Sequence, residues 1–232
     1  MPRLLTATLC AALLMLPSAA PARQGRATLD ASRVPAEAGA AREFVPRGWA
    51  VEEEVSGDLN GDSAADLVLK LVQAKRAAGA DENEERQRAL VVLLRGADGR
   101  LRRAAVAGRL LQCTSCGGAF YGVAEASAGV TVERGVLVVR QDHGSRNVVE
   151  QTFRFRYDPA TKTFPLIGYD ESDNDRATGA LVEESTNFLT GVRVVKRSQY
   201  DPRLDRHVVK STARTRVARS AATIEQVDYA QY

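Results

Sequence analysis

The sequence is poor in the residue types on which many metal and redox sites depend. Its 232 residues include two histidines, three cysteines and one tryptophan, and aromatic residues make up 6% of the chain. A structural zinc site takes four nitrogen or sulfur ligands, and a thioredoxin-like redox site requires βαβ units, which the pattern around the cysteines lacks. The composition therefore argues against a zinc protein and against a thioredoxin-like enzyme.

Long apolar runs and an excess of one charge are also missing. Beyond the amino-terminal segment, no run approaches the roughly 20 apolar residues of a membrane-spanning helix. The 32 basic and 29 acidic residues give a formal net charge of +3, which describes a mixed surface and not the basic face of a nucleic-acid-binding protein. We therefore expect no transmembrane segment and no nucleic-acid partner.

The amino terminus has the composition of a secretory signal peptide. Residues 1–22, MPRLLTATLCAALLMLPSAAPA, place Arg3 before an apolar stretch and end in a small-residue cleavage site. Because this segment contains one basic and no acidic residue, its removal takes the formal charge from +3 to +2. Cys10 lacks the adjoining small residue of a lipidation site. We expect an exported protein, periplasmic or secreted.

The rest of the chain has the pattern of a single antiparallel all-β domain. Residues 23–42 predict a linker with a short helix at 36–41, and residues 43–232 predict a meander of hairpins, sandwich- or barrel-like. Residues 67–72 and 89–95 are apolar on both faces, so they should be central strands. Between them, residues 73–88 predict a polar surface loop, with a short exposed helix as the alternative. The expected strands cover residues 49–55, 67–72, 89–95, 101–106, 130–132, 136–141, 148–157, 164–169, 191–197 and 208–218.

The stretch GDLNGDSAADLVL, residues 57–69, concentrates negative charge just before an apolar strand. Counting from Asp58, oxygen-bearing side chains stand at the first, third, fifth and ninth positions, and a main-chain carbonyl at the seventh can complete the set. Calcium takes 6 to 8 oxygen ligands in a flexible cage, whereas three unneutralised carboxylates in so short a loop repel one another. The predicted calcium ligands are Asp58, Asn60, Asp62, Ala64 and Asp66. The alternative is an Asx-rich hairpin turn without metal.

This spacing between two strands resembles the calcium loop of FG-GAP repeats. It matches at Asp58, Asn60, Asp62 and Asp66, while Ser63 replaces the usual glycine of the sixth position. We find one full copy, too few for the repeated blades of a propeller. More widely, FVPRGW, RALVVLLR, CTSCGG, QTFRFRY, PLIGYD and NFLTG resemble a family of secreted or lipid-anchored bacterial proteins. That resemblance implies export and an all-β fold but no activity.

Cys113 and Cys116 are the only cysteines after the predicted signal peptide. In an oxidising exported compartment, such a pair predicts a disulfide that closes a small turn. Haem attachment would require a histidine directly after the second cysteine, where the chain has Gly117.

Other polar groups give weaker signals for catalysis. Asp142, His143 and Ser145 stand in a predicted turn, where neighbours in sequence seldom adopt triad geometry. The acidic sets at residues 52–54 and 183–184 could supply paired carboxylates for glycoside hydrolysis, although alternating strand faces explain them as solvated groups.

These signals favour a non-enzymatic, calcium-stabilised β domain of the bacterial envelope, which binds a protein, a glycan or another envelope component. The alternative is a small envelope or extracellular hydrolase that uses carboxylates or the region of His143. A cleft containing two carboxylates from different strands would favour the hydrolase.

Overall fold

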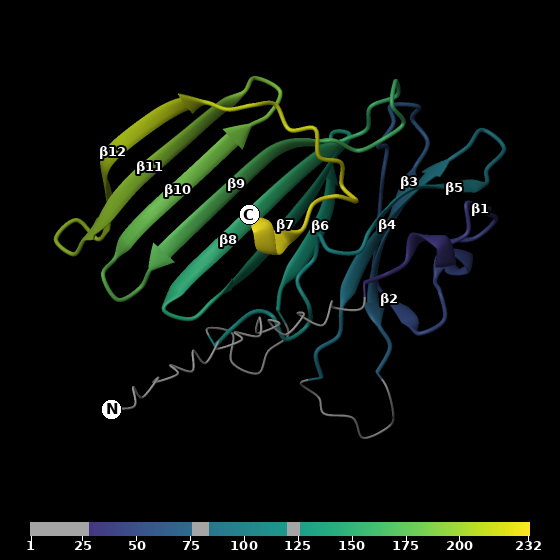
Figure 1. The fold of residues 1–232 in the computed structure, drawn as a ribbon, viewed down its shortest axis with the longest axis horizontal. Helices are drawn as coiled ribbons and strands as arrows, with labels where there is room; N and C mark the ends of the chain where they lie inside the picture. The colour runs from purple at the N-terminus through teal and green to yellow at the C-terminus, as the bar shows by residue number, and fades with distance from the viewer. Residues whose placement is uncertain (1–27, 76–83, 120–125) are drawn as a thin grey trace, which may run out of the picture.

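The computed structural model describes residues 28–75, 84–119 and 126–232. Over these residues the chain forms two antiparallel sheets in a meander of hairpins (Figure 1). The predicted signal peptide, residues 1–22, lies outside the described residues, as do residues 76–83 and 120–125. The all-β prediction is confirmed, and the sheets do not close into a barrel.

The first sheet has five strands in the order β1-β5-β4-β3-β2. Its two inner strands β3 and β4 are buried over most of their length, which confirms the prediction that the two fully apolar runs are central. One face packs against the second sheet, and the other is covered by the segment before β2. The strands are β1 (Glu37–Ala38), β2 (Trp49–Gly57), β3 (Asp66–Gln73), β4 (Arg88–Arg95) and β5 (Leu101–Ala107).

The second sheet has seven strands in strict sequence order, from β6 to β12. Alternation in β8 places Phe153 and Phe155 in the core between the sheets and leaves Arg154 and Arg156 outside it. The strands are β6 (Ala128–Glu133), β7 (Val136–Gly144), β8 (Asn147–Arg156), β9 (Leu166–Asp175), β10 (Ala180–Asn187), β11 (Val192–Asp201) and β12 (Arg206–Arg216).

The core between the sheets ends part-way across the larger one. None of the residues that form or flank it lies in β10, β11 or β12. In Figure 1 these strands extend beyond the five-stranded sheet, and the chain after β12 returns in front of β7 and β8. This returning segment is held by hydrogen bonds between the main chains of Leu166 and Ala222 (3.0 Å) and of Ile224 and Phe164 (2.9 Å).

The expected helix at residues 36–41 is wrong. The structure has β1 there, paired with β5, between two 3-10 turns, η1 (Ala31–Arg33) and η2 (Ala41–Phe44). Leu29, Val34 and Phe44 are buried against the five-stranded sheet, so burial of these side chains outweighs the helix propensity of the alanines. The described part of the expected linker thus belongs to the core.

Candidate functional site

The predicted calcium loop connects β2 to β3, and its side chains hydrogen-bond to its own backbone. The Asp58 carboxylate accepts the N–H groups of Gly61 at 2.7 Å and Ser63 at 2.9 Å. The Asn60 side-chain oxygen accepts the Asp62 N–H at 3.0 Å, and Asp62 accepts the Ala64 N–H at 2.8 Å. These contacts fix a tight loop with the carboxylates as acceptors.

Asp66 joins the loop to the sheet. Its side chain is fully buried and accepts two N–H groups at 2.8 Å, one from Leu59 in the loop and one from Arg95 at the end of β4. Burial raises the pKa of the Asp66 carboxyl, the two N–H donors lower it, and the charges of Asp62 and Asp58 raise it further. The ninth position of the loop is thus a buried carboxylate, whose negative charge is costly unless it is balanced.

Two residues of the predicted calcium loop have a left-handed backbone. Ser63 has φ +68° and Gly61 has φ +82°. A left-handed backbone costs a residue with a Cβ about 1–2 kcal/mol. The usual glycine would avoid this cost, so Ser63 weakens the loop without removing a ligand.

The predicted ligands are oxygen-bearing groups of the kind that calcium binds, although their carboxylate oxygens do not lie close together. Among the described residues, no lysine or arginine forms an ion pair with Asp58, Asp62 or Asp66. The Ala64 carbonyl accepts no hydrogen bond from a described residue. Three carboxylate oxygens of the loop do not, however, lie within 4.8 Å of one another. Because each oxygen has a second lone pair, it can keep its N–H partner and still accept a cation if the oxygens move closer together.

The loop lies where the two sheets meet. A Cβ at Gly57, the last residue of β2, would come within 2.6 Å of a methyl carbon of Val132 in β6. A Cβ at Gly135, in the turn after β6, would lie 3.7 Å from the Asp58 carbonyl oxygen. Any stiffening of this loop therefore acts on the contact between β2 and β6.

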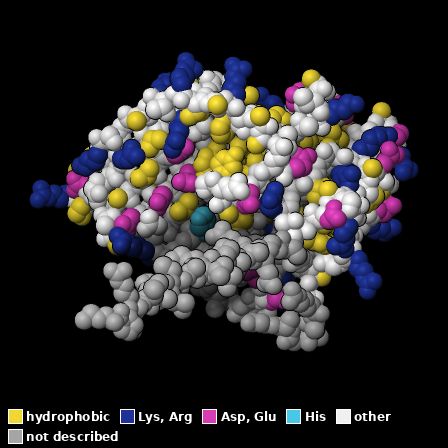
Figure 2. Space-filling view, in the orientation of Figure 1, with side chains coloured by type: hydrophobic (Ala, Val, Ile, Leu, Met, Phe, Trp, Pro, Cys, Tyr) yellow, Lys and Arg dark blue, Asp and Glu magenta, His cyan; other side chains and the backbone are white. Residues whose placement is uncertain are grey.

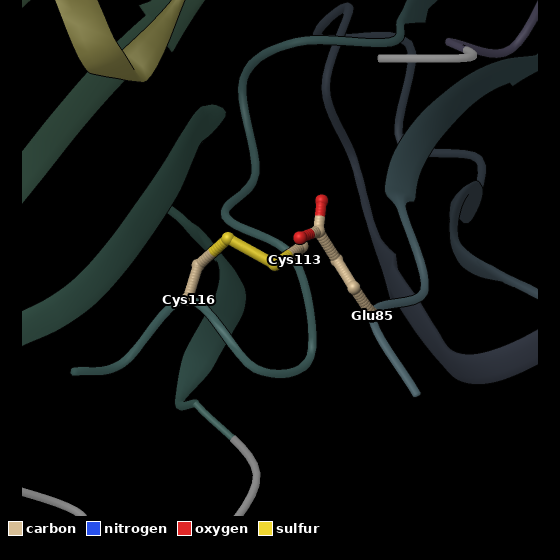
Figure 3. Close-up of side chains that lie close together, drawn as sticks. All are labelled: Glu85, Cys113 and Cys116. Atoms are coloured by element: carbon tan, nitrogen blue, oxygen red, sulfur yellow. A yellow bond between two sulfur atoms is a disulfide. The ribbon is translucent and has the colours of Figure 1, made fainter. Parts of the chain in front are cut away.

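Cys113 and Cys116 form a disulfide with an S–S distance of 2.07 Å. Cys113 is buried, Cys116 is partly exposed, and the Glu85 carboxylate lies beside them (Figure 3). The two sulfurs and a Glu85 oxygen lie within 4.8 Å of one another, the one such group of three found among the described residues. Cysteine binds metals as a thiolate, so the disulfide form offers no metal site here.

Two glutamates of β2 are used in ion pairs. Glu52 pairs through both carboxylate oxygens with Arg88, at 2.7 and 2.8 Å. Glu53 pairs with Lys70 at 3.3 Å, and the Lys70 ammonium group also donates to the Ala128 carbonyl at 2.6 Å. Arg88 and Lys70 are both buried. These carboxylates therefore neutralise buried cations and are not free for catalysis.

The residues near His143 do not assemble a triad. Asp142 and His143 lie within β7, which runs on to Gly144, so they are adjacent strand residues and not turn residues. Among the described residues, no hydrogen bond joins either side chain to Ser145. The structure offers no support for nucleophilic catalysis at this position.

A pair of carboxylates from different strands does occur on the larger sheet. Glu184 of β10, one of the acids noted in the sequence, stands directly opposite Glu171 of β9. The Tyr169 hydroxyl donates to Glu171 at 2.5 Å, and Arg193 of β11 forms an ion pair with Glu184. This grouping is not predicted from the sequence, since the acidic half of β9 and the whole of β10 lack a hydrophobic alternation.

Comparison of the chain with models of protein families, with curated proteins and with solved structures gives no match. The resemblance to FG-GAP loops and to a secreted family thus stays a prediction. Within residues 28–75, 84–119 and 126–232, no helix has the length and apolar character needed to cross a membrane.

Proposed function

We propose that this protein is an exported β domain whose β2–β3 loop binds a structural calcium ion and whose larger sheet binds another envelope component. The observation that carries the proposal is the donor set Asp58, Asn60, Asp62, Ala64 and Asp66, which combines the spacing of a calcium loop with no cationic partner among the described residues. The predicted signal peptide and the disulfide support export.

Calcium would act here by balancing the charge of the loop. Three carboxylates repel one another within nine residues, and one of them, Asp66, is buried. A divalent cation removes this repulsion and holds the loop against β4, through Asp66, and against β6, near Gly57. The expected result is a stiffer junction between the sheets.

The binding role is supported by the uncovered part of the larger sheet. Strands β10 to β12 contribute no side chain to the hydrophobic core between the sheets, and nine of the eleven residues of β12 are exposed, while His207 and Val208 are partly buried. The larger sheet is therefore wider than the core that it covers. The surplus surface is available to a partner.

The calcium proposal is tested by thermal unfolding of the mature chain with calcium and with a chelator. Calcium should raise the melting temperature, and Asp62→Ala should abolish the response. Asp158→Ala is the matched control, because Asp158 accepts the Ala160 N–H at 2.9 Å just as Asp62 accepts that of Ala64 at 2.8 Å. An equal response in wild type and Asp62→Ala would refute the loop as the site.

A second candidate function, hydrolysis of a glycan, is favoured by one observation. Glu171 and Glu184 stand opposite each other on neighbouring strands, and two facing carboxyl groups are the usual machinery of glycoside hydrolysis. The test is release of reducing sugar from cell-wall glycan, with Glu171→Gln as the inactive variant. No release by the wild-type protein would exclude this function.

A further inference from the structure

A hollow of about 310 Å³ lies on the face of the larger sheet from which the core side chains project. Its lining comes from three neighbouring strands and from the returning segment. Figure 2 shows hydrophobic side chains gathered near the middle of this face, with acidic and basic side chains around them. The residues that line it are Tyr169, Glu171, Glu184, Thr186, Phe188, Arg193, Val217 and Tyr232.

The strand register places the polar groups of the hollow side by side. Glu171 stands opposite Glu184, and Thr186 stands between Tyr169 and Arg193. Side chains directly opposite each other in an antiparallel pair have Cβ atoms about 4.5–5.5 Å apart. The two carboxylates are therefore neighbours, each oriented by its own donor.

Each of the two carboxylates is held by a hydrogen bond or an ion pair, but each can still accept hydrogen bonds from a ligand. Glu171 accepts the Tyr169 hydroxyl through one oxygen at 2.5 Å, and its other oxygen has no hydrogen-bond partner among the described residues. Glu184 accepts the Thr186 hydroxyl at 3.3 Å and pairs with Arg193. Since a carboxylate oxygen has two lone pairs, both acids can accept further hydroxyl groups.

Tyr232 provides an aromatic wall beside these acids. Its ring centroid lies 5.0 Å from that of Tyr169 and 5.4 Å from that of Phe153. The residue is 39% exposed and lines the hollow. An aromatic ring in this position offers an apolar surface next to hydrogen-bonding groups.

Among the described residues, two buried polar atoms in or beside this hollow lack hydrogen-bond partners. The Gln151 amide donates to the Tyr169 hydroxyl at 3.1 Å and to the Tyr232 carbonyl at 3.2 Å, yet its oxygen accepts nothing although the residue is only 2% exposed. The Nε group of Arg193 likewise has no acceptor. Unsatisfied buried groups are costly. A ligand that accepts a hydrogen bond would relieve this cost at Arg193, which lines the hollow.

We propose that this hollow binds a neutral pyranose unit of a glycan. The C–H face of the sugar packs on the Tyr232 ring, and its hydroxyl groups donate to Glu171 and Glu184 and accept from Arg193. The carboxylate pair disfavours an acidic sugar, and Arg193 disfavours a cationic amine. This inference rests on the binding role proposed above and names its ligand class.

The test is saturation-transfer NMR and titration calorimetry of the mature chain with three probes: cellotriose, maltotriose and the trimer of N-acetylglucosamine. At least one should bind with millimolar or better affinity, whereas a glucuronic acid oligomer should not bind. Tyr232→Ala and Glu184→Gln should each weaken binding about tenfold or more, as expected for loss of a stacking surface or of a hydrogen bond to a charged group.

Matched controls separate loss of the site from loss of the fold. Tyr200 is also 39% exposed but lies outside the hollow, and Glu183 precedes Glu184 without lining it. Tyr200→Ala and Glu183→Gln should bind like wild type, and all four variants should keep the wild-type far-ultraviolet circular dichroism. Loss of binding in Glu183→Gln equal to that in Glu184→Gln would refute this location.

Measuring calcium binding on the same sample distinguishes the two proposals. A protein that binds calcium but none of the three probes would overturn the saccharide inference alone. A protein that binds a probe but no calcium would overturn the calcium proposal and leave the saccharide site standing.

Discussion

Replacing Arg88 by methionine should cost far more stability than replacing a surface arginine. Arg88 is 2% exposed and pairs with both oxygens of Glu52. It also donates to the Ala126 carbonyl at 2.9 Å and lies 3.4 Å from the Cys113 carbonyl oxygen. The side chain therefore ties β4 to β2, to the disulfide turn and to the start of β6.

The expected loss of stability follows from the groups that lose their partner when Arg88 is replaced, namely the Glu52 carboxylate and the Ala126 carbonyl. Breaking a buried ion pair costs about 3–5 kcal/mol, because the remaining charge and carbonyl groups lose their partner. Lys70 lies 3.7 Å from Glu52 and partly compensates, so we expect the lower half of this range. For a domain of this length, about 3–4 kcal/mol lowers the melting temperature by roughly 6–16 °C.

The assay is urea unfolding followed by far-ultraviolet circular dichroism. Arg146→Gln is the control, since Arg146 pairs with Asp175 but its side chain is 63% exposed, and exposed pairs contribute about 0–1 kcal/mol. Glu52→Gln is a third variant in this assay. The free energy of unfolding lost in the double variant Glu52→Gln/Arg88→Met should be smaller than the sum of the losses in the two single variants. A loss of less than about 1 kcal/mol in Arg88→Met would refute the reasoning.

Three further predictions concern reduction of the disulfide, stability of the fold at alkaline pH and the predicted calcium loop. Glu85→Gln should speed reduction of the disulfide by dithiothreitol, because the nearby carboxylate disfavours the departing thiolate; an unchanged rate would contradict this, and Glu84→Gln is the control. Burial and the hydrogen bond to Glu171 raise the pKa of Tyr169, so this tyrosine stabilises the fold below pH about 10 and ceases to do so at higher pH; Tyr169→Phe should flatten the fall of melting temperature between about pH 9 and 11, and an unaltered slope would count against the assignment. Ser63→Gly should add about 0.5–1 kcal/mol in urea unfolding, as relief of the left-handed backbone exceeds the entropy cost of glycine; a destabilised variant would contradict it.

The sequence predicts most strands because their burial pattern is visible in the order of residues. The inner strands β3 and β4 are apolar on both faces, and β8 alternates phenylalanine with arginine. These patterns arise where a sheet face meets the core. They locate the elements that the core requires.

Strands that do not meet the core are not visible in the sequence. β10 reads as Ala-Leu-Val-Glu-Glu-Ser-Thr-Asn, and the second half of β9 is acidic. Neither face of the sheet meets the core there, so no alternation marks these residues as strands. The pairing of Glu171 with Glu184 depends on that register, and it becomes visible only when the sheet is assembled.

The predicted calcium loop is the reverse case, because its predicted ligands lie within nine residues and their spacing is a property of the sequence. The structure adds what spacing cannot give: the burial of Asp66, the left-handed backbone at Ser63 and the position of the loop against β6. The ion pairs of Glu52 and Glu53 required the fold, since their partners Arg88 and Lys70 come from other strands.

Titration calorimetry of the metal-free mature protein with calcium tests the central claim most directly. The account predicts saturable binding of one ion per chain, lost in Asp62→Ala and retained in Asp158→Ala. A wild-type protein that shows no heat of binding at millimolar calcium would contradict it and leave the loop as a hairpin turn held by its own hydrogen bonds.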